Sequence, residues 1–156
     1  MAIKEIKTQV HIRWMIRGDA TAVLNIEAAS FENPWSEDEL TRTLRHREVI
    51  GMVAELADEV VGVMIYELHK NRLHLINFAV APHVRRQGIG STMIEKLVSK
   101  LSHDRRNRIM LEVRESNLAA LLFFKSQGFR AIKILRDYYE DTTEDAYLMQ
   151  YRHVGD

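Results

Sequence analysis

The chain has 156 residues, of which 46% are apolar and 28% are charged, as in ordinary globular domains. Lys plus Arg and Asp plus Glu each number 22, and this balance argues against a protein that coats nucleic acid or a membrane surface. The absence of cysteine excludes disulfides, thiolate metal sites and a thiol nucleophile. No apolar stretch approaches the roughly 20 residues that span a bilayer, and residues 1–10 lack the apolar core of a signal peptide. We therefore expect one cytoplasmic domain, residues 1–156, without a metal site.

The first third of the chain predicts one strand and two helices. Residues 10–16 read as a strand, and Asp19 is a favourable N-cap for a helix that ends at about Ser30. The helix is broken by a segment that contains Pro34, and a capping box at Ser36 begins the second helix.

The middle of the chain predicts a hairpin, a third strand and a helix. Residues 49–57 and 60–69 form the hairpin, with a tight turn at 58–59. The third strand, about 73–80, leads into a glycine-containing turn and a helix that ends at about His103.

The last third predicts a strand at 108–114, a helix at 117–127 closed by Gly128, and strands at 130–135 and 146–152. The complete order is β-α-α-β-β-β-α-β-α-β-β. This order indicates an α/β protein with a mixed sheet and helices on its faces.

The glycine-containing turn predicts an anion site. A helix N-terminus presents unpaired backbone N–H groups and a partial positive charge, and glycine lets a ligand approach the backbone closely. Two arginines add positive charge, so we expect a phosphate or pyrophosphate ligand. The turn is neither a Walker loop nor a full Rossmann fingerprint. Its sequence is Arg85-Arg86-Gln87-Gly88-Ile89-Gly90.

Three polar residues near the apolar strands are candidates for chemistry. Glu112 interrupts the strand 108–114, and it is either a solvated carboxylate or, in a partly buried cleft, a general base. Asn117 is expected to cap the next helix. His74, at the start of the strand before the glycine turn, is either structural or a reserve base. The other histidines show no metal-ligand spacing.

Three motifs together resemble the signature of the GNAT superfamily of N-acetyltransferases: Arg85-x-x-Gly88-x-Gly90, Leu111-Glu112-Val113-Arg114-x-Ser116-Asn117 and Phe124-x-x-x-Gly128-Phe129. Further segments are similar to the branch that acetylates ribosomal-protein alanine and other N-termini: Pro34-Trp35-Ser36, Tyr138-Tyr139 and Glu144-Asp145-Ala146. The resemblance covers about residues 10–152.

The resemblance implies a fold of about seven strands, with a splayed central parallel pair and about four helices, and acetyl-CoA as the cofactor. In such enzymes the glycine turn, here Arg85 to Ser91, binds the pyrophosphate. The backbone of Phe78-Ala79-Val80 would pair with the pantetheine arm, and Asn117 would contact the cofactor. Glu112 stands where the family places its general base.

Phe124 departs from the family pattern. The alanine-acetylating enzymes usually have a tyrosine at this position, assigned as the general acid toward the CoA thiolate. A thiol has a pKa of about 8.5, so its thiolate can leave near neutral pH without an acid. Either the acid is dispensable, or Tyr138, Tyr139 or water replaces it. Phe124 is as readily explained by core packing as by a cofactor contact.

Two loops are candidates for the acceptor site. The segment 137–145 holds five acidic residues beside Tyr138 and Tyr139, which would suit a cationic peptide N-terminus, although such a run is also typical of a solvated loop. The opposite wall would be formed by Phe31, Glu32 and Trp35. Trp35 can equally be a helix-packing anchor.

We expect direct acetyl transfer in a ternary complex to the α-amino group of a protein or peptide N-terminus, with a ribosomal protein as one candidate. A backbone N–H near Val80 would polarise the carbonyl. The alternatives are lysine or small-molecule amines as acceptors, or a CoA-binding module without catalysis. A nucleic-acid partner would rest on a small basic cluster, and the balanced charge disfavours it: Arg105, Arg106 and Arg108.

Overall fold

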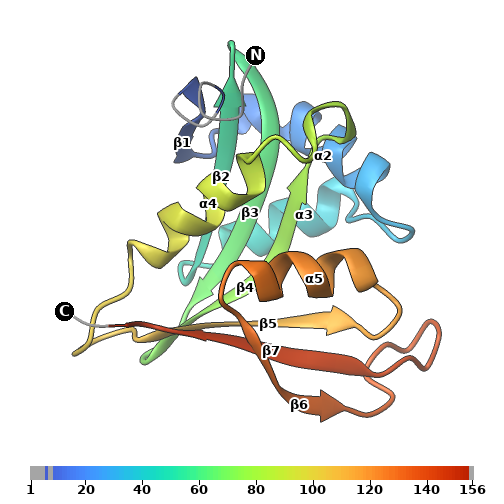
Figure 1. Ribbon diagram of the computed structural model, residues 1–156. Helices are drawn as coiled ribbons and strands as arrows, with labels where there is room; N and C mark the ends of the chain where they lie inside the picture. The colour runs from blue at the N-terminus through green and yellow to red at the C-terminus, as the bar shows by residue number, and fades with distance from the viewer. Residues whose placement is uncertain (1–5, 7–8, 155–156) are drawn as a thin grey trace.

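A seven-stranded sheet and four α-helices make up the part of the chain that the computed structural model describes, residues 6 and 9–154 (Figure 1). The elements in chain order are β1 (His11–Trp14), η1 (Arg17–Asp19), α2 (Ala20–Ser30), α3 (Glu37–Arg45), β2 (Val49–Leu56), β3 (Glu59–Leu68), β4 (Arg72–Val80), η2 (Pro82–Val84), α4 (Ile89–Val98), β5 (Arg108–Arg114), α5 (Leu118–Ser126), β6 (Arg130–Leu135) and β7 (Ala146–Arg152).

The strand order is β1-β2-β3-β4-β5-β7-β6, and β4 with β5 is the parallel pair in an otherwise antiparallel described sheet. The parallel pair arises because α4 carries the chain back between β4 and β5, as a crossover connection requires. The predicted element order and the mixed sheet with a central parallel pair are therefore confirmed.

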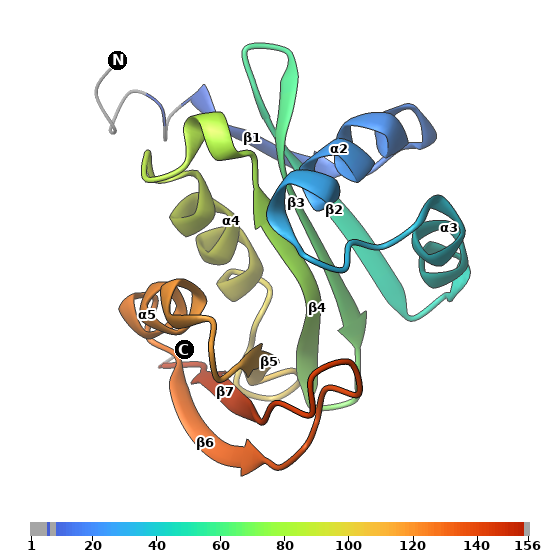
Figure 2. The ribbon, with the colours of Figure 1, turned by 90° about the vertical axis from the view of Figure 1, so that its right-hand side faces the viewer.

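Helices cover both faces of the sheet. In Figure 2, α4 and α5 lie on one face, and α2 and α3 lie on the other face against β2 to β4. Because side chains alternate along a strand, β5 directs Ile109, Leu111 and Val113 into the core, whereas Glu112 and Arg114 face the other side. The sheet thus places polar residues of β5 beside the edge of the α2 and α3 layer.

The predicted end of α4 at about His103 is wrong, because the helix ends at Val98. After Val98 the chain turns, with the Leu101 N–H donating to the carbonyl of Val98. The chain leaves the helical path at this turn, and Leu101 is buried in the core.

The hairpin between β2 and β3 has its turn at Ala57-Asp58 rather than at 58–59. Leu56 pairs with Glu59, which leaves a two-residue loop. Both loop residues have positive φ, 51° and 65°, as a twisted two-residue hairpin requires.

Asp19 stands at the N-cap of α2, as predicted, but its side chain makes no capping hydrogen bond to the helix. The carboxylate instead accepts from the Ile16 N–H at 2.8 Å and from both terminal nitrogens of Arg13 at 2.8 and 2.9 Å. Arg13 also donates to Glu55 on β2. The expected strand 10–16 is shorter in the structure, His11–Trp14, because the chain after it turns into η1, which ends at Asp19.

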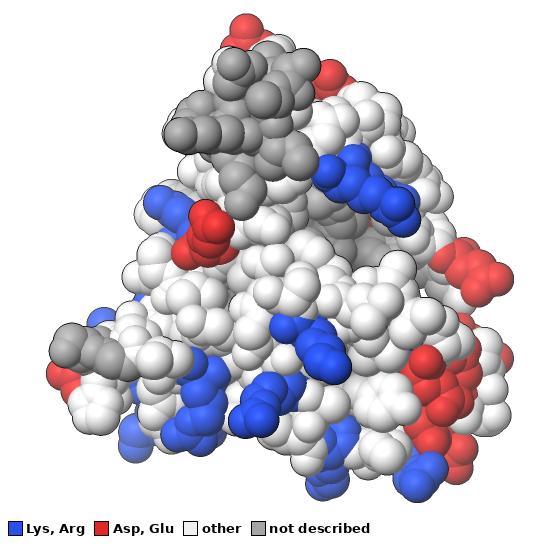
Figure 3. Space-filling view, in the orientation of Figure 1, with Lys and Arg blue, Asp and Glu red and all other residues white. Residues whose placement is uncertain are grey.

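On the face that Figure 3 shows, Lys and Arg are spread over the surface, whereas Asp and Glu gather mainly at the lower right. None of the described helices is both long and apolar enough to cross a membrane. Most of residues 1–10, where we expected no signal-peptide core, lies outside the described residues.

We predict that Asp19→Asn lowers the free energy of unfolding by about 1–3 kcal/mol at pH 7, because it breaks a charged hydrogen-bond cluster. Asp19 is 6% exposed, and the guanidinium of Arg13 lowers the pKa of its carboxyl below the usual 3.8. This stabilisation is present above pH 3.8 and is lost as the pH falls further, so the difference between wild type and variant should shrink there.

Urea unfolding at neutral and acidic pH measures this difference. Asp58→Asn, in the exposed hairpin turn, is the matched control and should have no effect. An equal loss in both variants would contradict the prediction.

Candidate active site

The site begins where β4 and β5 separate. Their parallel ladder has three pairs, the last between His74 and Met110. Beyond that point β4 continues to Val80 beside β3, and β5 continues to Arg114 beside β7. Backbone groups that face the gap have no ladder partner across it, so an extended ligand can hydrogen-bond there.

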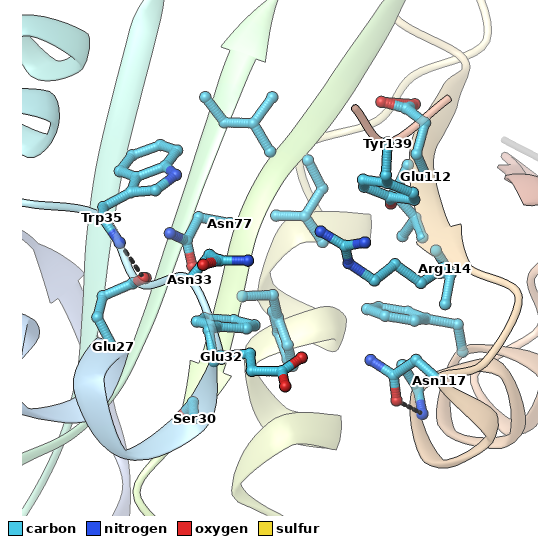
Figure 4. Close-up of a pocket in the computed structure, with 18 residues that line it drawn as sticks. Glu27, Ser30, Glu32, Asn33, Trp35, Asn77, Glu112, Arg114, Asn117 and Tyr139 are labelled. Carbon is cyan, nitrogen blue, oxygen red and sulfur yellow. Dashed lines mark hydrogen bonds between the residues drawn. The ribbon is translucent and has the colours of Figure 1, made fainter. Parts of the chain in front are cut away.

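A cavity of about 430 Å³ lies at this separation. It is lined by residues of α2, β4, β5, α5 and two loops, and Figure 4 shows its polar side chains in two groups. Glu27, Trp35 and Asn77 lie together on one side of the cavity. Glu112, Arg114 and Tyr139 lie on the other.

Glu112 and His74 form the central polar contact of the site. Nε2 of His74 lies 2.8 and 2.7 Å from the two carboxylate oxygens of Glu112. Since a carboxylate only accepts, Nε2 donates. The two side chains are 16% and 19% exposed, so both are partly buried and still reachable by water. The structure thus brings the candidate base and the reserve base into contact.

Tyr138 joins this contact from the loop between β6 and β7. Its hydroxyl donates to Oε1 of Glu112 at 3.3 Å. Burial, followed by the charge of Glu112, raises the pKa of Tyr138, so the phenol stays protonated at neutral pH. Tyr139 packs edge-on against Tyr138, with ring centres 5.0 Å apart, and burial raises its pKa to about 12.

The two predicted acceptor loops meet over the cavity. Asn33, from the loop after α2, donates to Asp141 of the β6–β7 loop at 2.8 Å. Phe31 and Glu32 line the cavity beside Asn33 and are exposed. Trp35 lines it too and packs against the hydrophobic core, so both readings of this tryptophan describe its position.

The acidic residues of the β6–β7 loop are largely paired within the protein. Asp141 receives two hydrogen bonds from Arg114, at 3.1 and 2.9 Å, and Glu144 accepts from Ser116 at 2.6 Å. Asp145 pairs with Arg136 at 2.9 Å. These charges are thus partly compensated, which weakens the expectation that the run itself attracts a cationic peptide.

The glycine turn has the geometry of an anion site. Gly88 has φ 86° at the N-cap of α4, and no side chain caps this helix end. The first N–H groups, from Ile89, Gly90 and Ser91, therefore have no partner within the helix. Arg86 also has a positive φ, 63°, so the turn is tightly bent.

Arg85 is already engaged in structural contacts. Its Nε donates to the Val80 carbonyl at 2.9 Å, and its Nη2 donates to the Ser30 hydroxyl at 3.0 Å. Arg85 thus ties the end of β4 to the end of α2. Its charge lies at the glycine turn, but its donors are shared with these two groups.

The remaining predicted cofactor residues lie at the α5 side of the cavity. Phe78 and Phe124 both line it and pack edge-on, with ring centres 5.6 Å apart. Phe124 is buried and also contacts Phe129, so it belongs to the core and to the cavity wall. Oδ1 of Asn117 accepts from the Ala120 N–H at 3.2 Å, which confirms the predicted helix cap.

Glu27 and Asn77 are two polar residues that the sequence reasoning missed. Glu27 is 1% exposed and Asn77 is 8% exposed, and both line the cavity. Two of their oxygens, Oε1 of Glu27 and Oδ1 of Asn77, are buried without a hydrogen-bond partner. A carboxylate among apolar helix residues and an amide within an apolar strand were the available signals.

A further polar group adjoins His74. One ligand atom each from Glu67, His69 and His74 lie within 4.8 Å of one another, and His69 contacts Glu67 at 3.2 Å. The sequence spacing did not suggest this group because His74 reaches it from the neighbouring strand, where it pairs with Glu67. His74 therefore belongs both to this group and to the contact with Glu112.

Open strand edges beside an uncapped helix N-terminus, with a hydrogen-bonded carboxylate at the gap, suit a transferase whose cofactor is extended and carries phosphate. Residues 20–129 match the acetyltransferase (GNAT) family, and the chain belongs to that family. It is an acetyltransferase enzyme that uses acetyl-CoA.

Several relatives agree over most of the chain. The sequence is 32% identical over 133 residues to the ribosomal protein bS18-alanine N-acetyltransferase of Escherichia coli, covering 84% of this chain and 89% of that protein. The crystal structure of the Escherichia coli enzyme superposes with a TM-score of 0.83 at 28% identity, covering 94% and 96%. Ard1 from Thermoplasma volcanium gives a TM-score of 0.83 at 26% identity, covering 94% and 99%.

The residues present fit acetyl-CoA. The uncapped α4 N-terminus suits a pyrophosphate, and the unpaired strand edges of β4 and β5 suit an extended amide-containing arm. Gly90 keeps α4 close to α5, because a Cβ there would lie 3.1 Å from the Phe123 ring.

We predict that Gly88→Ala raises the Kd for acetyl-CoA about tenfold. A left-handed residue with a Cβ is strained by roughly 1–2 kcal/mol, and relief of this strain moves the N–H groups of the turn. Gly128→Ala is the matched control, since Gly128 also has a left-handed φ, 95°, and lies after α5.

Isothermal titration with acetyl-CoA and thermal unfolding separate binding from stability. Both variants should lose stability, and only Gly88→Ala should lose affinity. Equal affinities in the two variants would show that the turn does not hold the pyrophosphate.

Proposed function

We propose that this enzyme transfers acetyl from acetyl-CoA to the α-amino group of a protein or peptide N-terminus. The observation that carries the proposal is Glu112, held by His74 and Tyr138 at the edge of the cavity between β4 and β5. The names of the relatives that match most of the chain support the same acceptor class, and ribosomal-protein alanine is the finer candidate.

The chemistry of the acceptor fits a single carboxylate base. An amine must lose a proton before it can attack, and a free α-amino group has a pKa near 8, against about 10.4 for lysine. Glu112 can take that proton through water, and the hydrogen bond from His74 keeps its carboxylate oriented. Deprotonation of a lysine side chain by the same base is less favourable, because the lysine ammonium has the higher pKa.

Acetyl-CoA supplies the activated acetyl thioester. The β4 backbone, residues Phe78, Ala79 and Val80, would hold the pantetheine arm, and a backbone N–H near Val80 would polarise the carbonyl. Tyr138 is our candidate proton donor, because Phe124 has no hydroxyl and Tyr138 is protonated at neutral pH. Tyr138 would give its proton to the CoA thiolate, and Glu112 would replace it with the first proton taken from the ammonium. The second N–H proton, lost as the amide forms, would leave to water.

The acceptor would enter between the two loops that meet at Asn33 and Asp141. Phe31, Glu32 and Trp35 provide one wall, and Tyr139, against which Tyr138 packs, provides the other. A cleft between two walls can accommodate the end of a peptide chain. This shape supports an N-terminus as the acceptor, in preference to a side chain on a flat protein surface.

We predict that Glu112→Gln lowers kcat/KM for a peptide acceptor at least about 100-fold at neutral pH, because glutamine keeps the hydrogen bond to His74 but cannot take a proton. Acetyl-CoA affinity should not change. Glu115→Gln, at an exposed carboxylate just after β5, serves as the control and should match wild type. Unchanged kcat/KM in Glu112→Gln would remove this residue as the base.

We predict that a peptide with a free N-terminus is acetylated, whereas the same peptide with a blocked N-terminus and an internal lysine is not. Spermidine should also be inert. Mass spectrometry of the products reports the acetylated nitrogen. Turnover of spermidine or of the lysine alone would replace this proposal by the alternative of small-amine or side-chain acetylation.

A further inference from the structure

Glu27 is a buried carboxylate that lacks a cation. It lies in the last turn of α2, where the negative end of the helix dipole disfavours an anion. The Trp35 N–H donates to its carboxylate at 3.4 Å, the Asn77 side chain lies beside it in Figure 4, and no described ion pair includes it. Burial raises the pKa of its carboxyl. The free enzyme thus holds a group that a bound cation would stabilise.

Glu27 and Asn77 together leave two acceptor oxygens open. The described hydrogen bond to the Glu27 carboxylate comes from the Trp35 N–H, which donates to Oε2. Oε1 of Glu27 and Oδ1 of Asn77 are both buried and unpartnered, and both residues line the cavity. Figure 4 shows the two side chains adjacent, across the cavity from Glu112. Two buried acceptors in one wall call for a ligand with two donors.

The place of Asn77 in β4 relates these acceptors to the reacting end of the cofactor. The ladder between β3 and β4 is irregular between Ile65 and Tyr66, where Ile65 pairs with Asn77 and Tyr66 with Leu75. Ile76 is thereby set out of register, and Asn77 immediately precedes Phe78, the first residue proposed to hold the cofactor arm. A donor bound at Asn77 would lie beside that arm.

We propose that Oε1 of Glu27 and Oδ1 of Asn77 receive the α-ammonium group of the acceptor peptide. This inference rests on the proposed function and deepens it. An ammonium offers three N–H donors: two match these oxygens, and the third proton is the one that leaves to Glu112 through water. The neutral amine keeps its two N–H bonds on Glu27 and Asn77, which leaves its lone pair free to attack. One of these two protons then leaves to water as the amide forms. Glu27 and Asn77 are therefore positioning residues that recognise a primary amine.

The test separates charge recognition from folding. Glu27→Gln and Asn77→Ala should each raise the KM for the acceptor peptide about tenfold, the value of one hydrogen bond to a charged group, and leave the KM for acetyl-CoA unchanged. Glu37→Gln removes an exposed carboxylate on α3, outside the cavity, and should change neither constant.

A matched ligand pair gives a second readout. With CoA present, isothermal titration compares a peptide that has a free N-terminal alanine with the same peptide that begins with lactate, which replaces the ammonium by a hydroxyl. Wild type should prefer the amine, and Glu27→Gln should lose most of that preference while its affinity for the lactate peptide stays the same. Asn77→Ala carries the test if Glu27→Gln does not fold.

The experiments distinguish a failure of the proposed function from a failure of this inference. If wild type acetylates no free N-terminus, the proposed function fails. If wild type acetylates the peptide but Glu27→Gln and Asn77→Ala keep the acceptor KM and the amine preference, the proposed function stands and this inference is overturned.

Discussion

The parting of β4 and β5 is the constraint on which the rest of the site depends. Two parallel strands that pair for three residues and then diverge expose backbone groups that elsewhere would be bonded to a neighbour. That arrangement persists because each strand keeps its other partner, β3 for β4 and β7 for β5. The sheet therefore stays continuous while it opens a binding gap, and acidic and basic side chains can be placed on both sides of that gap.

The site combines two carboxylates with different environments. Glu112 is hydrogen-bonded to His74 and Tyr138 and reachable by water, which suits proton transfer. Glu27 is almost fully buried and lacks a cation, which suits recognition of a charged group. One carboxylate alone would have to bind the ammonium and accept its proton, and a division between two residues removes that conflict.

Much of the fold was predictable because local signals agree with tertiary structure. The Asn117 cap and the left-handed Gly88 and Gly128 follow from local backbone chemistry. Asp19 stands at its predicted N-cap, but its carboxylate binds Arg13, a contact that was hidden because Arg13 lies on another element. Cross-strand contacts were equally hidden: the Glu112–His74 contact joins residues 38 apart, and the open oxygens of Glu27 and Asn77 become visible only once α2 lies against β4.

Arg85 connects the glycine turn with the end of β4 and the end of α2. Arg85 is the first residue of the glycine turn, and its guanidinium donates to the Val80 carbonyl and to the Ser30 hydroxyl. Ser30 is the last residue before the loop that carries Phe31 and Glu32. One side chain therefore holds three segments together, so the position of the glycine turn and that of the loop after α2 depend on each other.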